Sequence, residues 1–138
     1  MKTGFINAVR QNKHELICAA AVTVAYMLNK LIFINITSGD WGYFFRCYFN
    51  DLICPIFFLS YCKFIFSLAK IRINNYFIFL GIGMAAGFAW EYVIPLFKHN
   101  SISDPYDLLC YFVGTHIYYL IHRLSLIKAA VCNEVRHC

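Results

Sequence analysis

The sequence predicts an all-α integral membrane protein, a bundle of four transmembrane helices with both chain ends in the cytoplasm. Two features of composition support this: 61% of the 138 residues are hydrophobic and only 14% are charged. A soluble domain of this size would not normally have that composition. The apolar residues also fall into four blocks, each close to the roughly 20 residues that a helix needs to cross a bilayer core of about 30 Å.

The four blocks define the expected helices. Unsatisfied backbone groups are costly in hydrocarbon, so each block should be helical. The expected helices, which make one integral membrane domain of residues 1–138, span 16–36, 48–68, 76–96 and 106–127.

The start of the second helix is the hardest boundary to place. Its apolar run begins near Trp41 but contains Arg46, Asn50, Asp51 and Lys63. Aromatic residues are typical of the membrane interface, so the segment after Trp41 suits the headgroup level and leads into the helix proper.

The charges predict the orientation of the helices. With a cytoplasmic N-terminus, most of the twelve Lys and Arg residues lie on the inner side, as the positive-inside rule requires. The exceptions are Lys30, Arg46 and Lys98. Of the seven acidic residues, only Glu15 and Glu134 lie inside. The net charge of +5 therefore indicates topology and contact with anionic lipid, and not nucleic-acid binding.

Glu91 is the first candidate site residue, because the predicted boundaries place it roughly 7 to 8 Å below the outer end of the third helix. Gly83 and Gly87 precede it at four-residue spacing, a pattern of small residues that lets another helix pack closely. An ionisable residue on that face is a functional candidate. The alternative is that Glu91 only reaches the interface between Trp90 and Tyr92.

The fourth helix contributes two more candidates, Asp104 and Asp107. Asp104 followed by Pro105 is also a strong helix start, with Asp104 as the N-cap and Asp107 facing the positive end of the helix dipole. Capping accounts for one aspartate and need not account for both. The helix also has a polar, small-residue face that packs inward or lines a wet cavity, formed by Asp107, Tyr111, Gly114, Tyr118 and His122.

Asp51 and Lys30 complete the set of candidates. Asp51 lies near the outer end of the second helix, and Lys30 in the outer third of the first. An unpaired charge at that depth is costly, so we expect Lys30 either to reach outward or to act as the charge partner of Asp51 or Glu91.

Residues 83–121 resemble the VanZ-like membrane proteins, a family named for a factor in teicoplanin resistance. The matching residues are Glu91 late in one helix, then Asp104 and Asp107 after a short outer loop, with Gly114 seven residues further on. Tyr111 stands where the family commonly has asparagine, and the family's glutamine after the glutamate and its loop arginine are missing here. The resemblance implies an outward-facing polar site in a bacterial plasma membrane, touching a cell-envelope or antibiotic-related molecule.

Several other chemistries find little support. The carboxylates could hold a hard cation such as Mg²⁺, but no ligand spacing is specific for a metal, and we expect no cofactor. The seven cysteines are scattered and behave as small apolar residues. No nucleophile is paired with a base by spacing, which argues against an enzyme. His122, beside Arg123, is interpreted as a residue of the inner interface rather than part of a proton relay.

Three functions follow. The first is a VanZ-like envelope protein of unassigned activity, whose outer acidic site, with Tyr111, binds a polar or cationic ligand. The second is a small oligomeric transporter or channel that uses Glu91 and Asp107 as an ion or proton path. The third is a helix-packing partner in a larger membrane complex, in which Gly83, Gly87 and Gly114 make the contacts and the acidic residues are caps and anchors.

Overall fold

The structure, a computed structural model, describes residues 9, 12–97 and 104–136. Every regular element in these residues is helical, as the sequence predicts. The basic residues Lys2, Arg10 and Lys98, which contribute to the predicted orientation, lie outside the described residues.

The first long helix is continuous from Lys13 to Ile36 but changes its winding near the end. It comprises α2 (Lys13–Leu28), a π-helical turn η1 (Asn29–Phe33) and a short α3 (Ile34–Ile36). The π-turn begins at Asn29, a fully buried residue whose Nδ2 donates to the Phe45 carbonyl at 2.9 Å. Such turns hold one extra residue and are frequent at functional sites.

The second segment begins with α4 (Gly39–Cys47), which covers the expected interfacial stretch, and continues as α5 (Phe49–Leu68). The expected start at 48 is therefore one residue early. The segment ends in a Schellman turn: Ile71 N donates to the Phe66 carbonyl at 2.8 Å and Lys70 N to the Ser67 carbonyl at 3.0 Å. Lys70 has the left-handed backbone that this turn requires, with φ of 61°.

The third segment runs from Tyr76 to Leu96, the bounds expected from the sequence. It comprises α6 (Tyr76–Phe88), a second π-turn η2 (Ala89–Val93) and a 3₁₀ turn η3 (Ile94–Leu96). The Asn75 side chain caps its start by accepting a hydrogen bond from Phe77 N at 2.9 Å.

The last helix, α7 (Pro105–Arg136), begins one residue earlier and ends nine residues later than the expected 106–127. Residues 128–136, which mix charged and small apolar residues, continue the helix, whereas the hydropathy pattern had placed its end at the edge of the apolar run.

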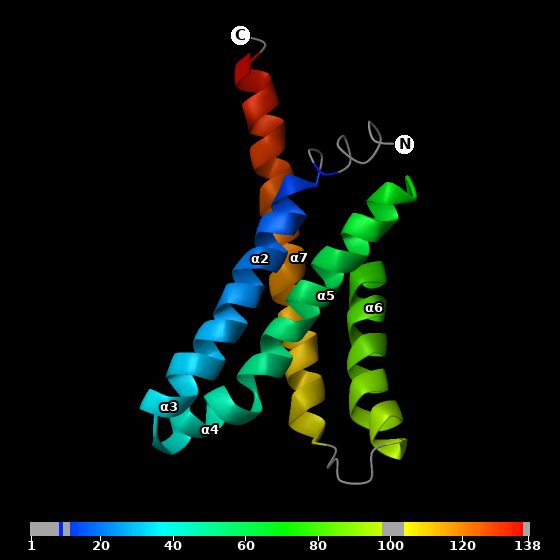
Figure 1. The fold of residues 1–138 in the computed structure, drawn as a ribbon. Coiled ribbons are helices and arrows are strands. Elements are labelled where there is room, and N and C mark those ends of the chain that lie inside the picture. Colours follow the sequence, from blue (N-terminus) through cyan, green and yellow to red (C-terminus); the bar gives the residue numbers. More distant parts are fainter. Residues whose placement is uncertain (1–8, 10–11, 98–103, 137–138) are drawn as a thin grey trace.

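Helix α5 occupies the centre of the bundle and packs against α2, α6 and α7, and α7 also packs along α6. In Figure 1 the start of α2, the end of α5 and the start of α6 lie at the same end as the C-terminal half of α7. We call this the basic end, because it carries Lys63, Lys70, Arg72, Arg123 and Lys128. The opposite, acidic end carries Asp40, Asp51, Glu91, Asp104 and Asp107.

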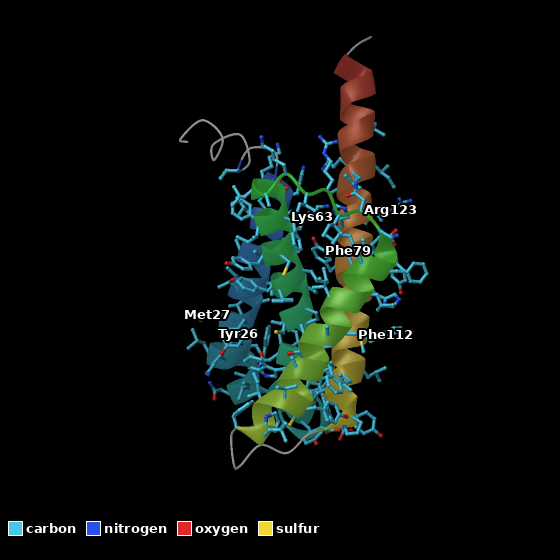
Figure 2. All side chains as sticks on the ribbon, turned by 90° about the vertical axis from the view of Figure 1, so that its right-hand side faces the viewer. Tyr26, Met27, Lys63, Phe79, Phe112 and Arg123 are labelled. Carbon is cyan, nitrogen blue, oxygen red and sulfur yellow. The ribbon has the colours of Figure 1, made fainter. Side chains whose placement is uncertain are left out.

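The molecule places polar side chains inside and apolar side chains outside. The apolar core is small, consisting of Ile56, Leu59, Phe79 and Tyr118. Lys63 and Phe79 lie between the helices, whereas Met27 projects outward (Figure 2). Polar and charged residues that are buried include Glu15, Asn29, Ser60, Glu91, Thr115 and His122. This distribution is the reverse of a water-soluble domain and suits a lipid surrounding.

Three segments are long and apolar enough to cross a membrane. They are Lys13–Ile36, Gly39–Leu68 and Tyr76–Leu96. The chain is therefore an all-helical protein of the multi-pass membrane type.

Candidate functional site

The start of α7 places two of the predicted site residues, Asp104 and Asp107. Asp104 caps the helix, because its Oδ1 accepts a hydrogen bond from Tyr106 N at 3.0 Å. Its Oδ2 accepts a second hydrogen bond, at 3.3 Å, from the hydroxyl of Tyr48 between α4 and α5. Asp107 lies one turn further along and is half-buried. Capping therefore occupies Asp104 and leaves the carboxylate of Asp107 for other contacts.

Glu91 lies in the π-turn η2 and is buried, with 7% of its surface exposed. Its carboxyl group is near enough to that of Asp107 for the two to interact electrostatically. It is also close enough to Asp51 and Asp104 for direct electrostatic repulsion, as Asp51 is to Asp107. Residues from three helices thus converge into what we call the acidic cluster, formed by Asp51, Glu91, Asp104 and Asp107.

The acidic cluster has no cationic partner among the described side chains, those of residues 12–97, 104–128 and 131, where the ion pairs all involve Glu15. Lys30 does not form the expected pair with Asp51 or Glu91. It is exposed, and its Nζ lies 5.9 Å from the centroid of the Tyr26 ring. Of the two arrangements expected for Lys30, the structure shows the one in which the side chain extends outward. This position avoids the cost of burying an unpaired charge.

Tyr111 lies one turn below Asp107, fully buried, and its hydroxyl donates a hydrogen bond to Cys54 Sγ at 3.6 Å. Beside it is a cavity of about 430 Å³ whose walls include Tyr26, Asp51, Trp90 and Tyr111. The lining is mostly apolar and aromatic, with the Asp51 carboxylate as its acidic group. Such a cavity could hold an apolar group next to a negative charge.

The three predicted packing glycines all lie in close helix contacts. A Cβ added at Gly83 would lie 2.2 Å from Thr115 Oγ1, and one at Gly87 would lie 2.8 Å from Tyr111 Cγ. At Gly114 it would lie 2.1 Å from the Leu52 carbonyl oxygen. These glycines therefore let α6 and α5 approach α7 more closely than any side chain would allow.

No group of three or more His, Cys, Asp or Glu side chains within the described part of the chain could hold a metal ion. The described cysteines, Cys18, Cys47, Cys54, Cys62 and Cys110, are free thiols. The acidic cluster is therefore better suited to a diffuse cation than to a tightly ligated one.

A second polar site, at the basic end, was not anticipated from the sequence. Glu15 from α2 is buried and accepts hydrogen bonds from Tyr118 Oη at 2.9 Å and from His122 Nδ1 at 3.2 Å. Lys63 Nζ lies 3.8 Å from Glu15 Oε1 and 2.6 Å from His122 Nε2. Lys63 Nζ also lies 2.9 Å from His122 Nδ1, so the ammonium group is close to both ring nitrogens.

These four residues, Glu15, Lys63, Tyr118 and His122, form what we call the Glu15 network. Sequence reasoning placed Glu15 and Lys63 on the inner side only by charge, and interpreted His122 as an interface residue. The sequence does show that Glu15, Lys63 and His122 lie at a similar depth, because each is within or next to an apolar stretch near the same membrane face. Which faces of three different helices meet is set by packing and could not be read from the spacing.

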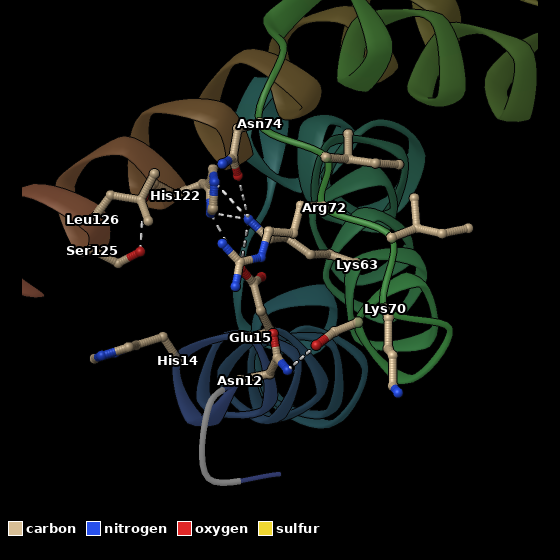
Figure 3. Close-up of a pocket in the computed structure, with 13 residues that line it drawn as sticks. Asn12, His14, Glu15, Lys63, Lys70, Arg72, Asn74, His122, Ser125 and Leu126 are labelled. Carbon is tan, nitrogen blue, oxygen red and sulfur yellow. Dashed lines mark hydrogen bonds and ion pairs between the residues drawn. The ribbon is translucent and has the colours of Figure 1, made fainter. Parts of the chain in front are cut away.

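The Glu15 network forms one wall of a pocket of about 510 Å³ at the basic end. Its other walls include Lys70, Arg72 and Asn74 from the connection between α5 and α6. Figure 3 shows Arg72 and Lys63 directed into this space, with Glu15 below them. Asn12 closes the α2 side and donates a hydrogen bond to Ser67 Oγ at 2.6 Å. We call this cavity the basic pocket.

One face of α7 joins the two sites. Asp107, Tyr111, Thr115, Tyr118 and His122 recur every three or four residues, and all but Asp107 are buried. The Thr115 hydroxyl, midway, has no hydrogen-bond partner among the described residues. The predicted polar face of this helix therefore lies inside the bundle.

Comparisons with family models, with curated proteins and with solved structures found no match to this chain.

Proposed function

We propose that this chain is a four-span, VanZ-like protein of the bacterial plasma membrane whose outward-facing acidic cluster binds a cationic ligand. The fourth span would be α7, which packs along α5 and α6. At about 1.5 Å per residue its 32 residues extend about 48 Å, more than a bilayer core requires. Its apolar side chains Phe112, Val113, Leu120 and Leu124 are exposed in the bundle, as lipid-facing residues would be.

The distribution of charge supports an orientation with both chain ends in the cytoplasm. The basic end carries Lys63, Lys70, Arg72, Arg123 and Lys128, whereas Lys30 and Arg46 lie toward the other end. The positive-inside rule assigns the basic end to the cytoplasm. The acidic cluster then faces outward, toward the cell envelope.

The single observation that carries the proposed activity is the convergence of four carboxyl groups with no cation beside them within the described residues. Neighbouring carboxylates repel each other, and a bound cation removes that repulsion. The adjacent cavity offers the aromatic rings of Tyr26 and Trp90, which attract organic cations. The best-fitting ligand class is therefore an amphiphilic organic cation.

The resemblance to VanZ-like proteins agrees with this assignment. Glu91, Asp104 and Asp107, which carry the resemblance, lie together although the chain separates them by an outer loop. Their convergence supports an envelope role without naming a reaction.

The test is equilibrium binding of tetraphenylphosphonium to the purified full chain in a neutral detergent. The double variant Glu91→Gln/Asp107→Asn should bind about tenfold more weakly, as expected when a charge-assisted contact is lost. Asp40→Asn is the matched control, because Asp40 is an exposed acid at the same end but outside the acidic cluster. Equal affinity in all three proteins would exclude the cationic site and favour the role of a helix-packing partner.

A second candidate, a proton pathway, is favoured by the buried polar face of α7. Carboxyl groups lie at one end of that face and the Glu15 network at the other, with the unpaired Thr115 hydroxyl between them. Reconstituted vesicles with an imposed pH gradient would test it. Proton flux should fall in Glu91→Gln and in Thr115→Val, and flux no greater than in protein-free vesicles would rule the pathway out.

A further inference from the structure

The basic pocket contains more positive than negative charge. Lys63, Lys70 and Arg72 line it, and Glu15 is its one carboxylate. Glu15 is already matched by Lys63 at 3.8 Å and by the His122 hydrogen bond at 3.2 Å. With the described side chains of residues 12–97, 104–128 and 131, neither Lys70 nor Arg72 forms an ion pair. Lys70 and Arg72 are therefore the two cations of the pocket without a counter-charge among the described side chains, whereas the charge of Glu15 is balanced by Lys63.

The backbone holds one of these cations in a costly conformation. Lys70 occupies the left-handed position of the Schellman turn, where glycine is the usual residue. A lysine in that position is less favourable than glycine, because its Cβ crowds the backbone. The turn fixes the point at the pocket rim from which the Lys70 side chain leaves the backbone.

The remaining lining groups suit an anion as well. Asn74 contributes an amide beside Lys63, with 3.5 Å between its Oδ1 and Lys63 Nζ. His14 lies on the α2 side of the same space. The first turn of α2 also lies at this end, where the helix dipole is positive. Each feature alone is common, but here they surround one cavity.

We propose that the basic pocket binds a phosphate group, with Arg72 and Lys70 as its direct ligands and Lys63 as the third cation. A guanidinium group matches phosphate oxygens in pairs, and an ammonium group adds a point charge. Glu15 does not touch the ligand but holds Lys63 and His122 in position. The phosphate could belong to an anionic lipid headgroup or to a soluble phosphate ester, since both present the same chemistry. Assignment to the cytoplasmic leaflet rests on the proposed orientation, whereas binding itself does not.

The position of the pocket favours the lipid source. It lies at the end of the bundle where α5 ends and α6 begins, beside exposed apolar residues such as Leu68 and Ile71. Basic pockets between helices at this membrane level bind anionic headgroups in other membrane proteins.

Three ligands separate the two sources in binding measurements on the purified full chain in a neutral detergent. They are phosphatidylglycerol, diacylglycerol, which lacks a phosphate, and glycerol 3-phosphate. Retention of phosphatidylglycerol with no retention of the other two supports the lipid headgroup. Comparable binding of glycerol 3-phosphate supports a soluble ester. Equal retention of phosphatidylglycerol and diacylglycerol, with no binding of glycerol 3-phosphate, overturns the phosphate site.

The variants test the named ligands of the phosphate. Lys70→Asn/Arg72→Gln removes both cations, and asparagine tolerates the left-handed position, so the turn should persist. Phosphate-dependent binding should fall about tenfold, as for the loss of charge-assisted contacts. The matched control is Arg123→Gln/Lys128→Gln, which removes the same charge from exposed positions at the same end, outside the pocket.

An equal loss of binding in both double variants would show a general electrostatic attraction and overturn the site. Retained binding in Lys70→Asn/Arg72→Gln would do the same. These results are independent of tetraphenylphosphonium binding at the acidic cluster, so the phosphate site and the proposed function can fail separately.

Discussion

The two ends of the bundle treat buried charge in opposite ways. Glu15 and Glu91 are equally buried, each with 7% of its surface exposed. Glu15 lies 3.8 Å from an ammonium group and accepts two hydrogen bonds from side chains. Glu91 instead lies beside other carboxyl groups, with no cation among the described residues. Burial therefore does not by itself distinguish a structural charge from a functional one; the identity of its neighbours does.

The difference predicts opposite responses to neutralisation. A carboxylate matched by a buried lysine holds the helices together, and its loss leaves the lysine uncompensated. A carboxylate surrounded by other carboxylates is repelled by them, and a bound cation relieves that repulsion. The basic end should therefore determine stability, and the acidic end should respond to ligand.

The largest effect is expected for Glu15→Gln. This change leaves Lys63 buried without a counter-charge and should destabilise the bundle by roughly 3–5 kcal/mol. Unfolding in mixed micelles of neutral detergent and increasing dodecyl sulfate measures it. The double variant Glu15→Gln/Lys63→Met should recover much of the loss. A loss of less than about 1 kcal/mol in Glu15→Gln, the range typical of exposed ion pairs, would contradict the comparison.

Close helix contact at Gly114 should give the next largest effect. A methyl group there would lie 2.1 Å from the Leu52 carbonyl oxygen and 2.5 Å from Pro55 Cγ, so α5 and α7 must separate. Gly114→Ala should cost about 1–3 kcal/mol in the same unfolding assay. Gly81→Ala is the control, because nothing lies within 4 Å of its added Cβ. If both variants were equally stable, the α5 and α7 contact would be looser than described.

Neutralising Glu91 should have the opposite sign from neutralising Glu15. In Glu91→Gln the repulsion from Asp107, Asp51 and Asp104 is relieved, so the ligand-free protein should gain on the order of 1 kcal/mol. The stability gain and the loss of tetraphenylphosphonium affinity should appear in the same variant. Destabilisation by Glu91→Gln would show that its charge is matched by a partner after all.

The smallest effect is expected for Lys30→Met. Lys30 is exposed and forms no ion pair within the described residues, so unfolding should change by no more than about 0.5 kcal/mol. Membrane insertion should also be unchanged when followed by protease protection. A large loss of stability would revive the pairing of Lys30 with the acidic cluster.

The helices could be predicted because the length of each apolar stretch can be read directly from consecutive residues. The third segment matches the expected 76–96 at both ends, and the second differs by one residue at its start. The capping of α7 by Asp104 also follows from adjacent residues. The stretch after Ile127 was lost to the same method, because hydropathy reports the membrane edge and not the end of the helix.

The same reasoning from the sequence pointed to the acidic residues as a candidate site but not to the Glu15 network. The acidic residues were singled out because several residues of one sign lie at one end of the predicted helices, and that common end could be predicted from the sequence. The Glu15 network needs three particular faces of α2, α5 and α7 to meet, and those faces are set by rotations of the helices. Lys30 illustrates the same point, since the alternatives of pairing and outward extension differ only in a rotation.

The two π-turns have a mechanical consequence for the acidic end. A π-turn holds one residue more than the α-helix around it, so it can pass along a helix one residue at a time. Each such step rotates the residue it passes by about 100° around the helix axis. In η2 a single step would turn Glu91 away from its present position near Asp107. A change of helical register, with no hinge and no domain movement, would thus suffice to open and close the carboxyl group to a ligand.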